Sequence, residues 1–345
     1  MGNEENSRQM NRPDGGKVLV TGGGGFLGGA IVRQLVQKGE RVFSLARNTY
    51  PELEALGVTQ IQGDISQPDI VLNACQGMDV IFHTAAKPGV WGAYEEYYRP
   101  NVMGTENIVA ACRQHRVPVL IHTSSPSVIF DGQDMAGVDE SRPYPDHLPT
   151  PYTRTKAAAE QLVLRESARG HIKAIILRPH LIWGPGDPHL VPRVIERADK
   201  LVKVGREDKL VDTIYIDDAA RAHLLAADSL AANPDLSGNI YFISQDEPIA
   251  MWDMINGILA AAGRDPIKRS LPAGVVWMVG ALLETLYRLT GRKQEPPMTR
   301  FVAKELATAH WFDISAAKRD LGYQPQINIS QGLDNLAAWL RTNDG

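Results

Sequence analysis

Residues 20–29 read VTGGGGFLGG and contain six glycines in ten positions. Glycine costs a helix or strand roughly 0.5–1 kcal/mol relative to alanine, so such a cluster indicates either a flexible loop or a main chain that another group must approach closely. The flanking residues decide between these two. Residues 17–21, KVLVT, predict a buried parallel strand, and residues 26–39 have the apolar spacing of a helix that ends at Gly39. A strand, a glycine turn and a helix in this order predict a dinucleotide site, where backbone N–H groups at the helix start face the pyrophosphate.

The cofactor is suggested by the strand that follows. The predicted pyrophosphate-binding residues are Gly22, Gly25, Phe26, Leu27 and Gly28. A second predicted strand, residues 41–46, ends about 20 residues beyond the glycines, where an NAD site carries an acid for the ribose 2′-hydroxyl. Ala46 stands there and Arg47 follows it. No carboxylate repels a 2′-phosphate and the guanidinium can pair with it, so the sequence favours NADPH. The alternative for Arg47 is a solvated loop charge.

Strand-like and helix-like segments continue to alternate up to residue 179. The strand-like segments are 58–65, 78–86, 117–125 and 172–179, and the helix-like segments are 105–115 and 157–168. This alternation predicts an α/β fold of the Rossmann type, a doubly wound parallel sheet with helices on both faces. Ligands bind such sheets at the carboxyl ends of the strands. Further cofactor contacts are therefore expected from Asp64, Ile65, Thr84, Ala85, Ala86 and Pro179.

The predicted organisation has three parts. They are a flexible tail at 1–16, a Rossmann NADP-binding domain formed by 17–180 and 211–245, and a smaller C-terminal substrate-binding region formed by 181–210 and 246–345. The tail lacks the apolar stretch of a signal peptide. The longest uncharged apolar run, residues 271–283, is shorter than the ~20 residues of a spanning helix, and burial in the protein or against a membrane surface both remain open.

The amino-acid composition argues against some classes of binding partner. The chain has 345 residues, of which 43% are hydrophobic and 22% charged, as in a globular protein. Its 36 basic and 40 acidic residues give a net charge of −4 without a basic block, which argues against nucleic acid as a partner. The two cysteines, Cys75 and Cys112, lie in no metal-ligand spacing. This argues against a disulfide framework or a metal site and favours the reducing cytoplasm.

Residues 150–156, TPYTRTK, predict a helix start that carries reactive side chains. Thr150 can cap the helix and Pro151 suits its first position, which places Tyr152 and Lys156 on one helical face. A phenol with an ordinary pKa of ~10 is a poor acid or base at neutral pH unless a nearby cation stabilises its phenolate, and Lys156 can supply that charge. A Tyr and a Lys four residues apart are common by chance. Together with the glycine turn and the serines at 124–127 they predict an oxidoreductase site.

Several motifs together resemble the extended short-chain dehydrogenase/reductase superfamily from residue 17 onward. They are TGGGGFLG (21–28), GDI (63–65), HTAA (83–86), NVMGT (101–105), TSSPSV (123–128), Tyr152-x-x-x-Lys156, LRPHLIWGPGD (177–187) and YIDDAARAH (215–223). The resemblance implies that Ser125 and Tyr152 polarise the substrate carbonyl, while Lys156 holds the nicotinamide ribose and tunes Tyr152. It also implies cofactor contacts from Asp64 and Asn101. A turn aspartate and a helix-ordering asparagine are the ordinary alternatives.

The C-terminal part resembles the 3β-hydroxysteroid dehydrogenase branch of this superfamily. The likeness rests on the apolar segment 271–289 and on residues 295–325, and segments 85–105 and 181–198 are most similar to bacterial 2-alkyl-3-oxoalkanoate reductases of olefin biosynthesis. This resemblance implies NADPH-dependent reduction of a long-chain 2-alkyl-3-oxoalkanoic acid to the 2-alkyl-3-hydroxyalkanoic acid, with Tyr152 donating the proton. Candidate cations for the substrate carboxylate are Lys87, His180 and Arg193.

Two other functions stay open. One is an NAD-dependent 3β-hydroxysteroid or sterol-4-carboxylate 3-dehydrogenase, against which Arg47 counts. The other is a catalytically idle NADPH-binding partner protein. The expected small-molecule partner is a lipid-like keto acid. The resemblance also allows a homodimer and a complex with a β-lactone synthetase and a decarboxylase of the same pathway, and contact with a membrane surface remains open.

Overall fold

The computed structural model describes residues 16–205 and 207–343. Seven parallel strands form the main sheet, in the order β12-β7-β5-β4-β1-β2-β3. They are β1 (Lys17–Thr21), β2 (Arg41–Ala46), β3 (Thr59–Gln62), β4 (Val80–His83), β5 (Val119–Thr123), β7 (Ala174–Pro179) and β12 (Ile240–Ile243). The predicted Rossmann-type sheet is confirmed. The predicted tail at 1–16 lies outside the described residues, except for Gly16.

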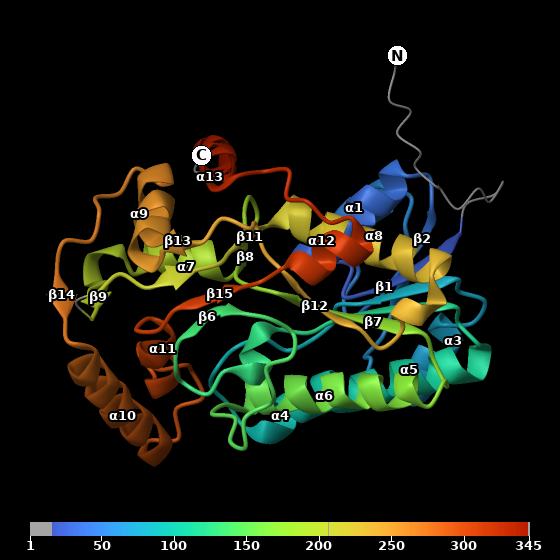
Figure 1. The fold of residues 1–345 in the computed structure, drawn as a ribbon, viewed down its shortest axis with the longest axis horizontal. Helices are drawn as coiled ribbons and strands as arrows, with labels where there is room; N and C mark the ends of the chain where they lie inside the picture. The colour runs from blue at the N-terminus through green and yellow to red at the C-terminus, as the bar shows by residue number, and fades with distance from the viewer. Residues whose placement is uncertain (1–15, 206, 344–345) are drawn as a thin grey trace.

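Helices cover both faces of this sheet (Figure 1). On one face lie α1 (Phe26–Gln37) and α8 (Ile216–Ala232), which pack against each other. On the other lie α3 (Pro68–Ala74), α5 (Gly104–His115) and α6 (Pro151–Ala168). The strands are buried on both sides because alternate residues enter the two cores: Val18 and Val20 of β1 join the core under α1 and α8, and Leu19 joins the other. These apolar runs explain why the strands could be predicted.

The chain order of the strands reverses between β1 and β4. From β1 the chain runs outward to β3, crosses back to β4 and then continues outward to β12. Open α/β sheets bind their ligands at such a switch point, outside the carboxyl ends of the strands. The short helices α2 (Pro51–Ala55) and α4 (Tyr94–Tyr98) and a π-helix at Arg99–Met103 lie in the connections that follow β2 and β4.

A second region is built around a four-stranded sheet in the order β13-β10-β15-β6. Its strands are β6 (Met135–Val138), β10 (Leu210–Val211), β13 (Ile249–Ala250) and β15 (His310–Phe312). Two-stranded ribbons pair β8 (Ile182–Trp183) with β11 (Ile214–Tyr215) and β9 (Lys203–Val204) with β14 (Ser270–Leu271). The helices are α7 (Leu190–Glu196), α9 (Met251–Ala261), α10 (Ala273–Leu289), α11 (Arg300–Glu305), α12 (Ser315–Leu321) and α13 (Ile329–Asn343).

The two regions interleave along the chain. Strand β6 belongs to the small sheet although it lies inside the span predicted for the Rossmann domain. Helix α12 packs against α8 and β12, although it lies inside the predicted substrate-binding region. The division of the chain into two domains therefore stays a prediction.

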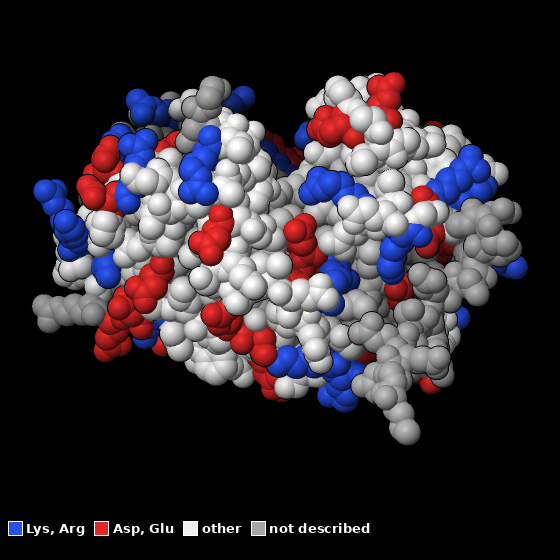
Figure 2. Space-filling model, turned by 90° about the horizontal axis from the view of Figure 1, so that it is seen from above, with Lys and Arg blue, Asp and Glu red and all other residues white. Residues whose placement is uncertain are grey.

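The surface carries charges of both signs. Figure 2 shows basic and acidic side chains interspersed over the face that is seen from above in Figure 1. None of the helices within residues 16–205 and 207–343 combines the length and the apolar character that crossing a bilayer requires.

Candidate active site

The glycine turn between β1 and α1 leaves no room for side chains at its close contacts. A Cβ on Gly28 would lie 2.2 Å from the carbonyl oxygen of Gly22, and one on Gly22, whose φ is +72°, would lie 3.1 Å from the Cα of Ala85. Gly25 immediately precedes α1, and no side-chain hydrogen bond caps that end of the helix. The backbone N–H groups and the positive end of α1 can therefore face an anion, as the sequence predicted for a pyrophosphate.

Hydrogen bonds fix the carboxyl ends of β1 and β4 beside this turn. The hydroxyl of Thr21 lies 2.9 Å from Nδ1 of His83 and accepts the backbone N–H of Ala85 at 3.2 Å. The hydroxyl of Thr84 donates to the carbonyl of Thr21 at 2.7 Å. Residues 84–86 consequently lie against Gly22 at the switch point, where the sequence placed them.

The ends of β2 and β3 bring opposite charges together. Arg47 is exposed directly after β2, and Asp64 accepts the backbone N–H of Ser66 at 2.8 Å. Partial burial acts to raise the pKa of Asp64, but the bonds from Ser66 and the positive charges of Arg47 and Arg99 hold it below its usual value. Arg99 is a second cation at this end of the site that the sequence reasoning missed, because only the fold brings residue 99 close to residue 64.

Helix α6 starts as predicted. Thr150 caps it by accepting the backbone N–H of Thr153 at 3.1 Å, the side chain of Thr153 returns a bond to the backbone of Thr150, and Pro151 occupies the first turn. The cap sets where the helix begins and thereby places Tyr152 and Lys156 on one face.

Tyr152 meets the end of β5 through Ser125. The Ser125 side chain is close enough to lower the pKa of Tyr152, and the hydroxyl of Ser125 lies 2.9 Å from that of Ser127. The hydroxyl of Ser124 is buried and has no partner among the described residues. The geometry thus pairs Tyr152 with Ser125 and leaves Ser124 apart.

The pKa of Tyr152 is raised above its usual value. Burial is the main cause, the side chain of Ser125 acts in the opposite direction, and the negative charge of Glu305 adds to the rise. Lys156 donates to the backbone carbonyl of Thr123 at 2.5 Å, and burial lowers its own pKa to about 8 against the opposing charge of Glu160. Lys156 is not among the groups that shift the pKa of Tyr152, so the expected lowering of this pKa by Lys156 stays a prediction. A raised pKa keeps the phenol protonated, as a proton donor must be.

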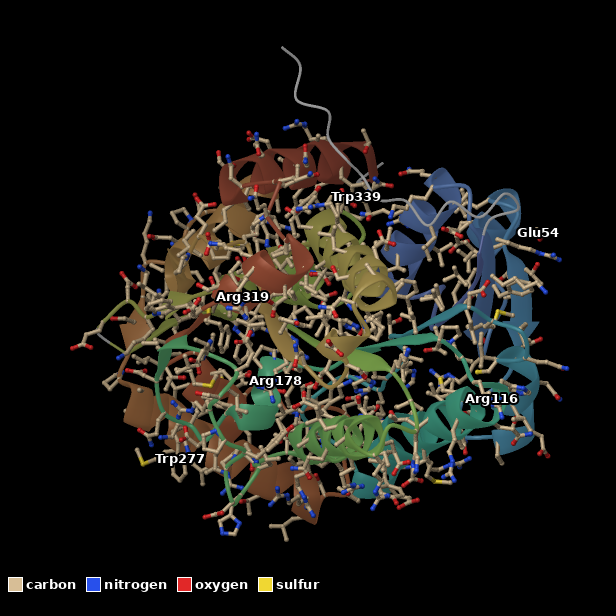
Figure 3. All side chains as sticks on the ribbon, turned by 45° about the vertical axis from the view of Figure 1, so that its right-hand side comes forward. Glu54, Arg116, Arg178, Trp277, Arg319 and Trp339 are labelled. Atoms are coloured by element: carbon tan, nitrogen blue, oxygen red, sulfur yellow. The ribbon has the colours of Figure 1, made fainter. Side chains whose placement is uncertain are left out.

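A buried ion pair supports the face of α6 that carries Lys156. The guanidinium of Arg178 at the end of β7 bonds both carboxylate oxygens of Glu160, at 2.5 and 3.1 Å, and the hydroxyl of Tyr144 donates to the same carboxylate. Figure 3 shows Arg178 in the interior of the molecule. The pair anchors α6 to the sheet one turn after Lys156.

Asn101 links α6 to the segment after β4. Its amide donates to the hydroxyl of Thr155 at 3.0 Å and to the carbonyl of Lys87 at 3.3 Å, and its oxygen accepts the N–H of Lys87 at 2.7 Å. Both amide protons are engaged within the protein. Asn101 therefore orders the site, and its cofactor contact stays a prediction, as does that of Pro179 at the end of β7.

The three candidate cations for a substrate carboxylate lie in different surroundings. Lys87 forms an ion pair with Glu96 at 2.5 Å. Burial lowers the pKa of His180 well below its usual value, which disfavours the charged ring, and its contact with a substrate carboxylate stays a prediction. Arg193 on α7 pairs with Glu295 at 3.0 Å, and its charge also acts on Glu305.

Glu305 is a site residue that the sequence reasoning missed. It ends α11, is half-buried, and accepts no side-chain hydrogen bond or ion pair from the described residues. Burial raises its pKa to about 8, while Arg193 acts in the opposite direction. Its charge also acts on Tyr152. No sequence signal marked it, because its neighbours are distant in the chain.

A cavity of about 830 Å³ leads to the start of α6. It is lined by Thr150 and Pro151, by the loop around Trp91, by Phe130 and by residues of α10 and α11. Tyr152 follows the lining residues directly in the chain. The cavity is large enough for a sizeable organic ligand at the start of α6, although neither Ser125 nor Tyr152 is among its lining residues.

Residues 19–273 match the model of the 3-beta hydroxysteroid dehydrogenase/isomerase family. The chain belongs to this family. It is 51% identical to the 2-alkyl-3-oxoalkanoate reductase of Shewanella oneidensis, over 94% of this chain and 86% of that protein. It is 46% identical to the enzyme of the same name from Stenotrophomonas maltophilia, over 93% of this chain and 98% of that protein.

A solved structure shares the fold. The UDP-glucuronic acid 4-epimerase of Bacillus cereus in complex with NAD superposes with a TM-score of 0.73 at 25% identity, over 94% of this chain and 99% of that one. The family membership and the fold agree with the superfamily expected from the motifs.

Proposed function

We propose that the chain is an NADPH-dependent reductase that converts a long-chain 2-alkyl-3-oxoalkanoic acid to the 2-alkyl-3-hydroxyalkanoic acid. The observation that carries the proposal is Tyr152 in the first turn of α6, whose phenol has a pKa above its usual value and is acted on by the side chain of Ser125. The two reductases described above support the substrate class, because they are about half identical to this chain over nearly its whole length.

The residues fit a dinucleotide with a 2′-phosphate. The turn around Gly22 and Gly28 has the bare backbone that a pyrophosphate needs, since any Cβ on Gly28 would fill it. Ala46 places no carboxylate at the end of β2, and Arg47 and Arg99 offer positive charge near Asp64. This arrangement favours NADPH over NADH.

The reaction assigns one task to each side chain. A bound NADPH supplies the hydride for the 3-keto carbon. Tyr152 donates its proton to the keto oxygen, which becomes the hydroxyl, and Ser125 hydrogen-bonds that oxygen while its negative charge develops. Lys156 is buried with a pKa of about 8, so it is largely cationic at pH 7, and we assign it the binding of the nicotinamide ribose.

Arg193 and Glu305 form the proposed carboxylate subsite. Arg193 supplies positive charge, and Glu305 with its pKa of about 8 is protonated at neutral pH. A protonated carboxyl can donate a hydrogen bond to the carboxylate of the substrate, whereas an ionised one would repel it.

The competing function is a 3β-hydroxysteroid dehydrogenase that uses NAD. It has a counterpart among the relatives, since the chain is 35% identical to the 3 beta-hydroxysteroid dehydrogenase/Delta 5-->4-isomerase of Mycobacterium tuberculosis, over 92% of this chain. The basic residues near Asp64 count against it, because they favour a 2′-phosphate and therefore NADPH.

Steady-state rates on the same purified protein separate the two functions. NADPH oxidation is measured with a 2-alkyl-3-oxoalkanoic acid, and NAD reduction with a 3β-hydroxysteroid. We expect turnover of the keto acid with NADPH and little with NADH. Turnover of the steroid with NAD alone would overturn the substrate and the cofactor together, and turnover of neither would support an idle binding protein.

A further inference from the structure

Helix α10 presents its apolar side chains to solvent. Its buried residues are Val276, Gly280 and Glu284, spaced four apart on one face. The opposite face exposes large side chains at helical spacing: Val275, Met278, Val279, Leu282, Leu286 and Leu289, with Trp277 beside them. Leu282 is 71% exposed and Leu289 82%. This polarity is the reverse of a helix that covers a core.

The contacts of the buried face fix this orientation. A Cβ on Gly280 would lie 2.8 Å from the backbone carbon of Thr299, so the main chains touch there. The carboxylate of Glu284 accepts the backbone N–H of Arg300 at 2.7 Å and two bonds from its guanidinium, at 2.9 and 2.7 Å. Turning the helix would bury the leucines but would strand Glu284 away from Arg300.

The segment of the chain that contains the exposed apolar face carries a net positive charge. Residues 264–304 contain eight Lys or Arg and three Asp or Glu, a formal charge of +5 in a chain whose total is −4. Two of the three acids are already paired, Glu284 with Arg300 and Glu295 with Arg193. Lys268 and Arg269 precede the helix, Arg288 lies in its last turn and Arg292 and Lys293 follow it; all five are exposed.

We propose that α10 docks the protein onto an anionic lipid bilayer, with the apolar face from Val275 to Leu289 in the acyl boundary and the basic residues among the headgroups. Interfacial helices combine these two features, and binding strengthens with buried apolar area and with anionic lipid. A second copy of the chain fits less well, because it would bring two segments of charge +5 together.

Docking through α10 would bring the cavity at the start of α6 close to the bilayer. Trp277, Tyr287 and Arg288 of α10 also line the cavity at the start of α6, so a lipid-like substrate could pass from the bilayer into this cavity. This use rests on the proposed function. The docking itself does not, since it is measured without substrate or cofactor.

Vesicle binding by the full chain tests the proposal. Co-sedimentation is compared on phosphatidylglycerol and phosphatidylcholine vesicles, for the wild type and for Leu282→Glu/Leu289→Glu. The matched control is Leu56→Glu/Leu210→Glu, two exposed leucines outside α10. We expect binding to the anionic vesicles that weakens in high salt, falls at least tenfold in the α10 variant and is unchanged in the control. Lys268→Glu/Arg269→Glu should weaken binding without altering the apolar face.

Fluorescence quenching locates the contact. Brominated phosphatidylglycerol should quench tryptophan emission in the wild type and in Trp339→Phe, and the quenching should be lost in Trp277→Phe. Figure 3 shows these two tryptophans at different edges of the molecule. Three results would overturn the proposal: equal binding by wild type and α10 variant, binding to neither kind of vesicle, or an α10 variant that only converts a dimer to a monomer.

Discussion

Helices α6 and α10 are almost equal in length, 18 and 17 residues, but they differ in which kind of side chain they bury and which kind they expose. Helix α6 buries polar groups, Lys156 and Glu160 among them, and each has a partner inside the fold. Helix α10 exposes its leucines and buries only three residues. Buried polar groups that have hydrogen-bond partners within the fold, as on α6, indicate a site that the protein forms by itself. A large exposed apolar face, as on α10, indicates a surface that binds a lipid bilayer or another molecule.

We expect the largest effect on activity from a substitution of Tyr152, the proposed proton donor on α6. In Tyr152→Phe the proton donor is lost while the fold and the cofactor turn remain, so we expect kcat to fall by ~10²–10⁴-fold. Isothermal titration with NADPH should give nearly unchanged affinity. Tyr94→Phe, on the exposed helix α4, is the control and should keep its rate. A wild-type rate in Tyr152→Phe would remove Tyr152 from the mechanism.

Glycines on the two helices should differ in the same way. A Cβ on Gly28 meets the carbonyl of Gly22 at 2.2 Å, whereas one on Gly274 in the first turn of α10 has nothing within 4 Å. Overpacking costs about 1–3 kcal/mol. We therefore expect Gly28→Ala to weaken NADPH binding by ~10–100-fold, as measured by fluorescence titration. Gly274→Ala should leave it unchanged, and equal effects at both sites would contradict the assigned turn.

Substitution of Arg47 tests whether the protein prefers NADPH over NADH. A hydrogen bond to a charged group contributes about 1.5–3 kcal/mol, so Arg47→Ser should reduce the preference for NADPH over NADH by roughly tenfold or more. The ratio of kcat/KM for the two cofactors measures this. Arg41→Ser, at the other end of β2, is the matched control. A preference that survives Arg47→Ser would shift the 2′-phosphate to Arg99.

We expect the smallest effect from Glu305→Gln, which should change how the stability of the protein depends on pH. Its pKa is raised from 4.5 to about 8, so the folded protein holds a proton that the unfolded chain releases in this range. The wild type should therefore lose stability relative to Glu305→Gln as the pH rises from about 4.5 to 8, with no difference below this range. Melting temperatures across the range measure it, and Glu54→Gln on the surface is the control.

The KM for the substrate should also depend on the ionisation of Glu305. Above pH 8 the carboxylate of Glu305 repels the substrate anion, so KM should rise in the wild type and less in Glu305→Gln. Lys156, whose pKa is also about 8, loses its charge in the same range in both proteins. An identical KM profile in the two would exclude Glu305 from the carboxylate subsite.

The sequence predicted the half of the site that depends on local rules. The glycine turn, the cap of α6 by Thr150 and the spacing of Tyr152 and Lys156 follow from backbone geometry within a few residues. Glu305 and Arg99 could not be found this way, because their roles depend on contacts between distant segments. The orientation of α10 was equally hidden, since apolar residues occur all around this helix and the bonds from Glu284 to Arg300 decide which face is buried.

Deuterium transfer gives the most direct test of the proposed reduction. NADPH carrying deuterium at the transferred C4 position is incubated with the protein and a 2-alkyl-3-oxoalkanoic acid, and the product is analysed by mass spectrometry. A Tyr152-dependent reductase should place one deuterium on carbon 3 of the hydroxy acid in the wild type, and almost none over the same time in Tyr152→Phe. A product without deuterium, or equal labelling by both proteins, would contradict the mechanism built on Ser125, Tyr152 and Lys156.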